Sequence, residues 1–450
     1  MRIGSVILAA GQGTRMRSSL PKVLHPLLGR PMLQYVLDAA RQATGSQPVV
    51  VIGHSGQEIQ QAFNGQADFV WQEPQLGTGH AVQQAEARLQ GQVDLVLVAY
   101  GDMPLLTAET LSLVVEAQRD FHGPMTMLTI QADDPRGFGR VLRGPDGMVQ
   151  AIVEEAQATP EQLALRELNP GVYCFRADWL WQALREVPLS PKGEYYLTDL
   201  VGIAAGAGLP VQARRLEDAR QGVGVNTRVH LAEASAILRE RINRQWMLAG
   251  VTLVDPATTY IEPGVTIGQD TVIWPNTLLR GDCVIGAGCE LGPNTVLQDT
   301  RVGDGCVIIA SFAEKASLEE DVHMGPYARL RPGARLDRGV HMGNFGEVKN
   351  SHLGAGVHMG HFSYIGDAEI GEKVNIGAGT ITCNYDGVKK SRTEIGERAF
   401  IGSDTMLVAP VKIGAGSRTG AGAVVTRDVP DHTLAVGVPA RAIRKLEKRD

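Results

Sequence analysis

The sequence of 450 residues predicts an α/β domain, a connecting helix and a parallel β-helix, in that order along the chain. Three observations predict this fold. A buried apolar run near the N-terminus ends in a glycine-rich loop, short apolar runs then alternate with helical stretches, and aliphatic residues recur at every sixth position in the second half. We expect the three parts to span residues 1–227, 228–249 and 250–450.

The glycine-rich loop follows the apolar run Ile3–Ala10, which is typical of a strand buried on both faces. Gly11 and Gly13 permit positive φ angles and a close approach of backbone N–H groups to a ligand. Arg15 and Lys22 add two nearby cations, which favours a polyphosphate site. The loop lacks the Gly-Lys-Ser/Thr of a Walker loop and the third glycine of a dinucleotide fingerprint. The alternative is an ordinary strand-to-helix turn with surface cations.

The bulk composition excludes several classes of protein. The net charge is −6 and aromatic residues make up only 5% of the chain, so a general nucleic-acid binder is not expected. The sequence opens without a signal peptide and has no apolar run long enough to span a bilayer, so we expect no membrane partner. Five cysteines without a C-x-x-C pair fit the reducing cytoplasm, where we expect the protein to act.

The alternation of apolar runs and helical stretches covers the first half of the chain. We expect further strands at Val49–Ile52, Phe69–Trp71 and Leu95–Tyr100, and helices at Met32–Ala43 and Ala108–Gln118. This order favours a mostly parallel sheet flanked by helices. Ligands of such sheets bind outside the carboxyl ends of the strands, where the glycine-rich loop would lie.

The stretch from Arg228 to Leu248 contains neither glycine nor proline and is rich in alanine. We expect it to form one helix that joins the two domains. Its apolar residues fall close to one face: Leu231, Ala234, Leu238, Ile242 and Met247.

The six-residue period begins after this helix, at Ile261, Ile267, Ile273, Leu279, Ile285, Leu291 and Leu297. Its phase shifts near Val302, Leu353 and Ile370, and the period ends at Val425. A parallel β-helix with three short strands and three turns per coil has this period. Roughly two dozen hexads predict about eight or nine coils, and strands ~4.8 Å apart would make a prism about 40 Å long.

Two sets of three residues in the repeats are best explained by structure. Small inward side chains are expected four residues after an aliphatic position, and this accounts for Cys283, Cys289 and Cys306. Val-His-Met-Gly occurs three times, and the repeat should stack its histidines on one outer face of the β-helix: His323, His341 and His358. A zinc site is conceivable there, but parallel stacking favours a surface ladder, because the side chains would not converge on a metal.

His361 and one long interruption do not follow the repeat. His361 lies two residues after Met359 and is therefore out of register with the ladder. The gap between Thr382 and Ile395 exceeds two hexads by one residue. It predicts a projecting loop, whose polar and cationic residues are Asn384, Tyr385, Asp386, Lys389, Lys390 and Arg392.

These features closely resemble the family of bifunctional N-acetylglucosamine-1-phosphate uridylyltransferases/glucosamine-1-phosphate acetyltransferases over essentially the whole chain. In the first domain the resemblance rests on Leu8–Met16, Lys22, Gln75–Ala81, Tyr100–Asp102 and Tyr195–Asp199. In the second domain it rests on Arg329–Gly333, Gly343–Phe345, Asn375–Gly379, Thr382–Gly387 and Gly402–Thr405. It implies a Rossmann-like nucleotidyltransferase domain followed by a left-handed β-helix.

By resemblance, the first domain transfers UMP from UTP to N-acetylglucosamine 1-phosphate and releases pyrophosphate. Asp102 and Asn226 would hold Mg²⁺, and Arg15 and Lys22 would neutralise developing charge. For Asp102 the alternative is a turn residue at a strand end, and for Asn226 it is a helix cap. The implied substrate-binding residues are Leu8, Ala9, Ala10, Gly11, Lys22, Gln72, Gly77, Thr78, Tyr100, Gly101, Asp102, Gly139, Glu154, Asn169 and Asn226.

The resemblance also implies that the β-helix acetylates glucosamine 1-phosphate with acetyl-CoA, which completes UDP-N-acetylglucosamine synthesis for the cell envelope. His361 would be the general base. The amino-sugar phosphate would be bound by Arg331, Lys349, Tyr364, Asn375 and Lys390. Acetyl-CoA would be bound by Ala378, Asn384, Tyr385, Ser403, Ala421 and Arg441. Such β-helices form homotrimers with the acetyl site between neighbouring copies.

The chain departs from the family pattern in two places. Gln12 stands where a lysine is frequent, so Arg15 and Lys22 would carry more of the phosphate charge. Gly437 stands where some members have an arginine for coenzyme A, and Arg441 could supply that charge.

Three other functions remain open from the sequence alone. Another sugar-phosphate nucleotidyltransferase could carry a structural or regulatory β-helix, although it should lack His361 and the loop before Ile395. A non-enzymatic assembly subunit would have no need of Arg15, Lys22 and Asp102. A β-helix carbonic anhydrase would bind zinc at the histidine ladder.

Overall fold

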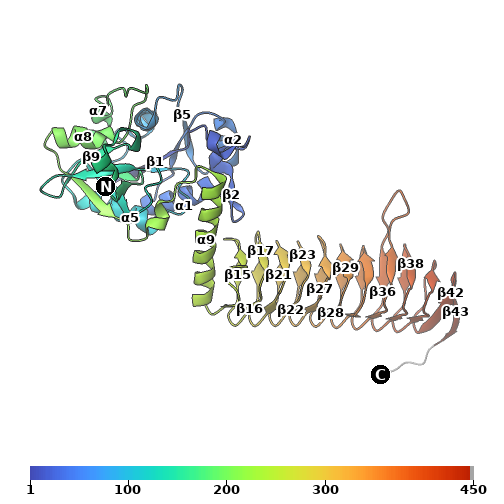
Figure 1. The fold of residues 1–450 in the computed structure, drawn as a ribbon. Helices are drawn as coiled ribbons and strands as arrows, with labels where there is room; N and C mark the ends of the chain where they lie inside the picture. Colours follow the sequence, from blue (N-terminus) through green and yellow to red (C-terminus); the bar gives the residue numbers. More distant parts are fainter. Residues whose placement is uncertain (446–450) are drawn as a thin grey trace. The chain divides into compact units, whose positions relative to one another are not determined.

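The computed structural model describes residues 1–445, which divide into two compact units (Figure 1). The first unit is Met1–Leu238 and the second begins at Arg239. Helix α9 (Arg228–Leu248) contains this boundary. Within residues 1–445, no helix is both long enough and apolar enough to cross a bilayer.

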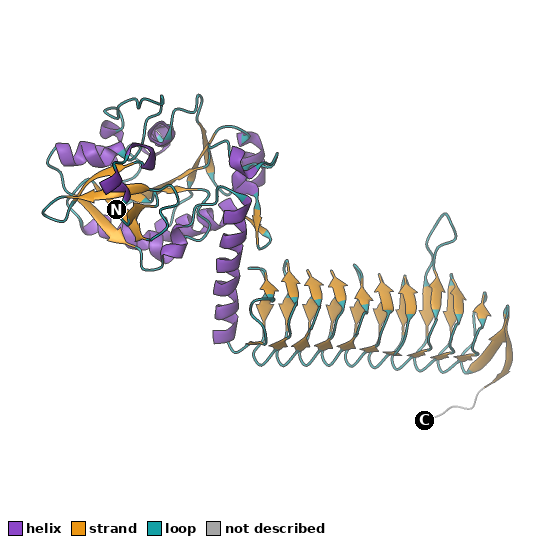
Figure 2. Ribbon diagram, viewed as in Figure 1, coloured by secondary structure: helices purple, strands orange, loops and turns teal. Residues whose placement is uncertain are grey.

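The first unit is built on one ten-stranded sheet in the order β5-β4-β1-β6-β11-β7-β10-β8-β9, with β12 paired to β7. Figure 2 shows the strands of the first unit in orange with helices around them. Its strands are β1 (Ile3–Leu8), β4 (Val49–Ile52), β5 (Asp68–Trp71), β6 (Leu95–Tyr100), β7 (Met125–Gln131), β8 (Gly139–Arg143), β9 (Val149–Val153), β10 (Glu167–Asn169), β11 (Tyr173–Arg176) and β12 (Val211–Arg215). The short strands β2 (Pro26–Leu27) and β3 (Arg30–Pro31) form a separate ribbon.

The helices of the first unit are α1 (Met32–Thr44), α2 (Gly56–Ala62), α3 (Thr78–Gln83), α4 (Glu86–Leu89), α5 (Ala108–Asp120), α6 (Pro160–Leu163), α7 (Ala177–Ala183) and α8 (Asp199–Gly206). The predicted strands and helices in this half are confirmed, and most of their limits agree within two residues. Thr107 caps α5, because its side chain accepts a hydrogen bond from the backbone N–H of Thr110.

The prediction of a mostly parallel sheet is wrong for most strand pairs beyond β6, although β12 and β7 are parallel. Strands β5, β4, β1 and β6 are parallel, but β11 runs antiparallel to both β6 and β7, and β8, β9 and β10 form antiparallel pairs. For β8 and β9 the physical reason is the length of the connection. Residues 144–148 join β8 to β9, which is too short for the crossover that a parallel pair requires.

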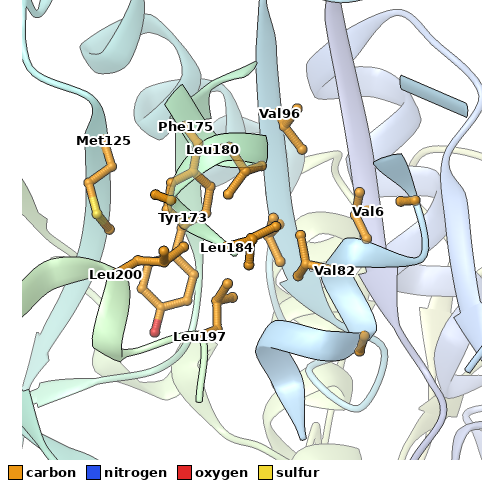
Figure 3. Packing of buried hydrophobic residues seen from close by; sticks show 14 of the residues in the cluster. Val6, Val82, Val96, Met125, Tyr173, Phe175, Leu180, Leu184, Leu197 and Leu200 are labelled. Atoms are coloured by element: carbon orange, nitrogen blue, oxygen red, sulfur yellow. The ribbon is translucent and has the colours of Figure 1, made fainter. Parts of the chain in front are cut away.

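Both faces of the sheet are buried, as strand β11 shows. Tyr173 and Phe175 point into one apolar cluster together with Leu180, Leu184 and Leu200 (Figure 3). Cys174, which lies between them in sequence, belongs to the cluster on the other face. The sheet is therefore a rigid layer whose strand ends are held in place by packing from both sides.

The second unit is a parallel β-helix whose three sheets we call faces 1, 2 and 3. Face 1 holds β13 (Thr252–Leu253), β16 (Val272–Ile273), β19 (Glu290–Leu291), β22 (Val307–Ile308), β25 (His323–Met324), β28 (His341–Met342), β31 (His358–Met359), β34 (Asn375–Ile376), β37 (Phe400–Ile401), β40 (Arg418–Thr419), β42 (Thr433–Gly437) and β43 (Ala440–Lys445).

Face 2 holds β14 (Tyr260–Ile261), β17 (Leu278–Arg280), β20 (Val296–Gln298), β23 (Phe312–Glu314), β26 (Arg329–Leu330), β29 (Gly346–Lys349), β32 (Ser363–Gly366), β35 (Ile381–Cys383), β38 (Met406–Val408) and β41 (Val424–Val425). Face 3 holds β15 (Thr266–Ile267), β18 (Val284–Ile285), β21 (Arg301–Val302), β24 (Ser317–Leu318), β27 (Arg335–Leu336), β30 (His352–Leu353), β33 (Ala368–Ile370), β36 (Thr393–Ile395) and β39 (Val411–Ile413).

The β-helix is longer than the eight or nine coils expected, since face 2 alone has ten strands. The six-residue period is recognisable in the sequence only from Ile261, whereas the first strand of the β-helix already lies at Thr252–Leu253. The shifts of phase correspond to coils of different length. Along face 1, the step along the chain from Val272 to its partner Glu290 is longer than the step from Val307 to its partner His323.

The inward positions of the β-helix agree with the sequence prediction for the cysteines. Cys283, Cys289 and Cys306 are buried, and their thiols lie close to backbone carbonyl oxygens inside the coils. Burial raises the pKa of the Cys283 thiol, which fits an inert packing residue.

Helix α9 buries Ala234, Leu238 and Ile242, as predicted, but Met247 is 40% exposed. Met247 lies five residues after Ile242, which turns its side chain about 140° around the helix from that residue. Asn243 is buried instead and donates hydrogen bonds to the carbonyl oxygens of Pro256 and Thr259, at 2.8 and 3.0 Å. The buried stripe is therefore shorter than predicted and includes a polar residue.

Candidate active sites

A cavity of about 670 Å³ lies at the carboxyl ends of β1 and β6. These strands are parallel neighbours, so the loop that follows Leu8 lies beside the segment that follows Tyr100. Ten of the predicted substrate-binding residues line this cavity: Leu8, Ala9, Ala10, Gly11, Lys22, Gln72, Gly77, Thr78, Tyr100 and Asp102. We call it the nucleotide cavity.

Amide side chains connect the loops around the nucleotide cavity. Gln72 is buried, and its Nε2 donates to the carbonyl oxygen of Gly77 at 2.8 Å. Nε2 of Gln72 also lies 3.2 Å from Nδ1 of His80. Gln75 donates to the carbonyl oxygen of Ala10, which ties the loop after β5 to the loop after β1. These walls of the cavity are therefore held in place before any ligand binds.

At two positions around this cavity, neighbouring atoms lie so close to the backbone that only glycine fits. Gly77 has a φ of 94°, and a Cβ there would lie 2.7 Å from the carbonyl oxygen of Tyr195. Gly13 has a φ of 62°, and a Cβ there would lie 2.7 Å from Cβ of Lys22. Gly11, by contrast, has open space around it, which is consistent with a backbone that faces a ligand.

The predicted cations converge on the predicted metal ligands. Nζ of Lys22 lies 2.5 Å from Oδ2 of Asp102 and 3.1 Å from Oδ1 of Asn226. Oδ1 of Asn226 also accepts a hydrogen bond from Nη2 of Arg15 at 3.0 Å. Two oxygen atoms from segments far apart in the sequence are therefore directed toward one point, which already holds a positive charge.

A second cavity of about 270 Å³ adjoins the first and shares Thr78, Tyr100 and Asp102 with it. We call it the sugar cavity. Four more predicted residues line it: Gly139, Glu154, Asn169 and Asn226. The structure thus brings the predicted residues into two compartments that meet at Asp102.

The electrostatics of the sugar cavity follow from burial and from Glu154. Burial raises the pKa of Glu154, and the nearby charges of Asp199 and Glu194 raise it further. Thr198 donates a hydrogen bond to Oε1 of Glu154 at 3.1 Å. Tyr100 is partly buried, and burial together with the charges of Glu154 and Asp102 raises the pKa of its phenol. Tyr100 therefore remains a neutral hydrogen-bonding group.

Asn169 is held in one orientation. Its Nδ2 donates to the hydroxyl of Tyr173 at 2.7 Å, and its Oδ1 accepts from the backbone N–H of Gly171 at 3.1 Å. At Gly171 a Cβ would lie 2.1 Å from the ring of Tyr100, so glycine is needed for this packing. The amide therefore presents a fixed polar edge to the cavity.

Some predicted residues lie beside the cavities, and some lining residues had no predicted role. In the described chain, neither Arg15 nor Gly101 lines either cavity; Arg15 acts through Asn226, and Gly101 donates a backbone hydrogen bond to Leu8 at 2.9 Å. Five lining residues were not predicted to bind a substrate: Gln75, Glu194, Tyr196, Thr198 and Gly171. The signal for most of them was present, since they fall within or next to the Gln75–Ala81 and Tyr195–Asp199 motifs.

The second candidate site lies on the β-helix, where three cations gather at the corner that follows face 2. Arg331 and Lys349 occupy the same outward position in successive coils. Lys390 lowers the pKa of Lys349 by its hydrogen bond and its charge, and Arg331 lowers it further. Glu347 accepts a hydrogen bond from Nη1 of Arg331 at 3.0 Å. Mutually repelling cations are stabilised by a bound anion such as a phosphate.

The predicted loop projects at the corner between faces 2 and 3, after β35 (Figure 1). Asn384 is 8% exposed, and its Nδ2 donates to Oδ2 of Asp367 at 2.5 Å. Gly366 leaves space for this contact, because a Cβ there would lie 2.4 Å from the hydroxyl of Tyr364 and 2.8 Å from Nδ2 of Asn384. Tyr385 is 60% exposed and so is available to a ligand.

His361, Ala378, Ser403 and Ala421 occupy one position of the corner between faces 1 and 2, in successive coils. The next residue has a positive φ in the later coils, such as 76° at Gly379 and 56° at Asp404. Phe362, which follows His361, does not have a positive φ. The corner that holds His361 therefore has its own backbone conformation, and its imidazole is exposed.

Asn375 and Arg441 lie away from the cation cluster within one chain. Asn375 is on face 1, where it continues the row of His358. Arg441 lies in β43 and pairs with Val436, whose side chain packs beside Gly420 next to the Ala421 corner. The residues assigned to the amino-sugar phosphate therefore occupy two different faces of the β-helix.

The histidine ladder is confirmed as a stack. His323 pairs with His341, and His341 with His358, with ring centroids 6.2 and 4.5 Å apart. The ring planes of His341 and His358 are inclined by only 11° to each other, so the rings are nearly parallel and their nitrogen atoms do not point toward a common metal position. Across residues 1–445, no group of three His, Cys, Asp or Glu side chains is placed to hold a metal ion.

The fold and the two sites define a nucleotidyltransferase joined to a hexapeptide-repeat transferase. Residues 5–194 match the family described as MobA-like NTP transferase domain. Residues 264–298 and 392–427 match the family described as bacterial transferase hexapeptide (six repeats).

Curated relatives match the chain over nearly its whole length. The bifunctional protein GlmU of Heliobacterium modesticaldum is 48% identical over 96% of this chain and 94% of its own. The proteins of the same name from Pelobacter propionicus and Trichlorobacter lovleyi are 48% and 46% identical, over 96% and 99% of this chain and 95% and 98% of their own. The chain belongs to the bifunctional GlmU family, and it is an enzyme that combines a uridylyltransferase with an acetyltransferase.

Proposed function

We propose that residues 1–227 carry out uridylyl transfer, that residues 250–450 carry out acetyl transfer, and that residues 228–249 connect them. The observation that supports this division most is the meeting of the two cavities at Asp102, where Lys22 and Asn226 also converge. A nucleotide in one cavity and a sugar phosphate in the other would react at their common boundary. The β-helix carries its own phosphate-binding cations, as a separate site requires.

In the first reaction, a phosphate oxygen of N-acetylglucosamine 1-phosphate attacks the α-phosphorus of UTP, and the bond to pyrophosphate breaks. The attacking oxygen is already anionic, so no general base is needed. Lys22 and Arg15 neutralise charge that develops on the phosphates. Gln72, Gly77 and Thr78 would hold the uracil, whereas Glu154 and Asn169 would orient the sugar.

The residues present fit a magnesium ion. Asp102 and Asn226 offer hard oxygen atoms, and both lie within 3.1 Å of Nζ of Lys22, which occupies a position suited to a cation. Magnesium is commonly held by one or two protein oxygens together with substrate phosphates. When bound, Mg²⁺ would neutralise the phosphates and orient the α-phosphorus. Lys22 would then turn from Asp102 to the phosphates.

In the second reaction, the amine of glucosamine 1-phosphate attacks the thioester carbonyl of acetyl-CoA. His361 accepts a proton from the attacking nitrogen, and the coenzyme A thiolate leaves. Arg331, Lys349 and Lys390 would hold the phosphate, while Tyr364 and Asn375 would contact the sugar. The corner column of Ala378, Ser403 and Ala421, the loop residues Asn384 and Tyr385, and Arg441 at the end of the coil would bind acetyl-CoA.

We further propose that the enzyme is a cytoplasmic homotrimer. Asn375 lies on face 1 and Arg331 and Tyr364 lie on face 2, so a neighbouring copy that packs against the corner would complete one site. The exposed aromatic residues Tyr327, Phe345 and Phe362 line this corner. All five cysteines are free, as expected in a reducing compartment.

One incubation tests the proposal: purified protein with glucosamine 1-phosphate, acetyl-CoA, UTP and Mg²⁺, analysed by mass spectrometry. We expect UDP-N-acetylglucosamine, pyrophosphate and free coenzyme A. Omission of Mg²⁺ should stop nucleotide-sugar formation and leave N-acetylglucosamine 1-phosphate. Absence of both UDP-N-acetylglucosamine and free coenzyme A would contradict the proposed reactions. Light scattering of the same sample tests the oligomeric state, and a mass other than that of a trimer would contradict the proposed homotrimer.

A further inference from the structure

The base of the loop at residues 384–392 is held on both sides by side chains from earlier coils. On one side, Asp367 accepts hydrogen bonds from Asn384 and Asn350, at 2.5 and 2.6 Å. On the other side, Nη2 of Arg392 donates to Oε2 of Glu369 at 2.5 Å. The backbone N–H of Ser391 donates to the carbonyl oxygen of Asn384 at 2.8 Å and closes the loop. Tyr385 and Lys390, which the proposed function requires, lie between these two anchors.

The second anchor continues to a histidine. Nδ1 of His352 lies 2.5 Å from Oε1 of Glu369, and its Nε2 lies 2.8 Å from Oδ1 of Asp337. Ionised carboxylates only accept hydrogen bonds. The imidazole therefore satisfies both contacts only as the imidazolium ion, with a proton on each nitrogen. Deprotonation leaves one carboxylate facing a lone pair.

We propose that Asp337, His352, Glu369 and Arg392 form a positioning chain that holds the 384–392 loop for acetyl transfer, and that His352 makes this hold depend on protonation. The inference rests on the proposed acetyltransferase function of the β-helix. Arg392 is two residues from Lys390, so loss of its anchor displaces the cation that would bind the sugar phosphate. His352 does not contact substrate and acts only through Glu369 and Arg392.

The charges around His352 determine the direction of the pH effect. Face 3 places Arg335 before His352 and Glu369 after it, and Glu394, paired with Lys412, follows Glu369. Burial lowers the pKa of His352, but its hydrogen bonds to Glu369 and Asp337 outweigh burial, and the pKa is raised. A raised pKa means that the anchor is complete at low pH and is lost as the pH rises through that value.

Two substitutions of His352 separate charge from packing. His352→Arg keeps a permanent cation with several donors, so it should hold Glu369 and Asp337 at every pH. His352→Gln removes the charge and should loosen the loop at every pH. The experiment measures KM for glucosamine 1-phosphate in acetyl transfer by the full-length protein, between about pH 6 and pH 9. Any titration of Lys349 is common to all variants, so differences between them report on residue 352.

Near the acid end of the pH range, we expect the unmodified protein and His352→Arg to have the same KM for glucosamine 1-phosphate. Near the alkaline end, the KM of the unmodified protein should be about fivefold higher than that of His352→Arg, a modest factor because the ion pairs are partly exposed. His352→Gln should show the raised KM across the whole range, with kcat little changed. Arg392→Gln keeps His352 and should raise KM by about the same factor. The matched control is His323→Gln, because His323 is an exposed histidine of the ladder on face 1. It should leave KM unchanged.

A second measurement does not depend on activity. Lys389 and Lys390 are exposed, so trypsin should cut the loop of the unmodified protein faster as the pH rises, relative to His352→Arg at the same pH. Equal pH profiles of KM for the unmodified protein and His352→Arg would overturn the proposal, as would equal tryptic rates. Failure of the unmodified protein to transfer acetyl would instead contradict the proposed function. The positioning chain would then have no acetyl transfer to support. Uridylyl transfer should be unchanged in every variant because its residues lie in the first unit. A little-changed kcat of acetyl transfer reports that the β-helix of each variant is folded.

Discussion

Nζ of Lys22 lies 2.5 Å from Oδ2 of Asp102, so the glycine-rich loop is joined by an ion pair to the end of strand β6. Both side chains are largely shielded from solvent, at 15% and 16% exposure. Lys22 reaches this position because Gly13 has no side chain to obstruct its Cβ. The pair links the polyphosphate loop to the predicted metal ligand, and substrate binding would have to separate it.

Asp102→Ala should reduce uridylyl transfer by about 10²-fold or more, the scale expected for loss of one preorganised electrostatic group. Acetyl transfer should be retained, because its residues lie in the other unit. Asp94→Ala is the control, since Asp94 precedes the same strand and pairs with Arg2 at the surface. Steady-state rates of both reactions would check this, and equal losses in the two variants would contradict the role of Asp102.

Gly77→Ala should impair UTP binding strongly. The new Cβ would lie within 2.9 Å of both the N and O atoms of the Tyr195 backbone. Gly65→Ala is a matched control, because Gly65 has a φ of 77° and no described atom within 4 Å of an added Cβ. Both variants should lose about 1 kcal/mol to backbone strain, which thermal unfolding would measure. Only Gly77→Ala should raise KM for UTP, and an equal rise in both would refute the argument from close approach.

Glu154→Gln should stabilise the first unit at neutral pH and weaken sugar binding. Burial raises the folded-state pKa of Glu154, so its charged form costs stability once the pH exceeds the unfolded value. The gain in thermal midpoint over the unmodified protein should therefore shrink as the pH falls. KM for N-acetylglucosamine 1-phosphate should rise by about tenfold, as expected for one hydrogen bond to a charged group. Glu186→Gln, at an exposed position, should change neither quantity.

His361→Asn should reduce acetyl transfer by about 10²-fold or more, the usual contribution of a general base. Uridylyl transfer should continue at the normal rate. His341→Asn, which alters the stacked ladder on face 1, serves as the control. Stopped assays of free coenzyme A would measure the loss, and a His361→Asn enzyme with full acetyl transfer would remove His361 from the mechanism.

The sequence predicted the strands that carry their own signal. Val49–Ile52 and Leu95–Tyr100 are uninterrupted apolar runs, and each is a strand with those limits. The antiparallel part of the sheet was not predicted, because β10 spans only the short segment Glu167–Asn169. It pairs with β7 and β8, which lie well before it in the chain, and no local pattern reveals such partners.

The candidate sites were predicted in the same uneven way. Lys22, Asp102 and Asn226 were selected from motifs, and the structure brings them together. The packing of Gly171 against the ring of Tyr100, which lines both cavities, was not foreseen, because no local pattern joins these two residues. The contact of His352 with Glu369 was also missed, since it joins two successive coils and follows only from their register.

Coils of unequal length coexist along the β-helix without disturbing its interior. The step along the chain from Asn375 to its partner Phe400 is longer than the step from His358 to Asn375, because the projecting loop lies within it. The neighbouring inward residues Ile376 and Ile401 are nevertheless only 3% and 0% exposed. Length changes are therefore absorbed at the corners, and a descendant of this chain could gain or lose a segment there without rebuilding its interior.

The loop that bears Tyr385 and Lys390 has the form of such an insertion. A designer could graft a new peptide between Asn384 and Arg392, where the chain already projects from the corner after β35, and keep every coil above and below it in register.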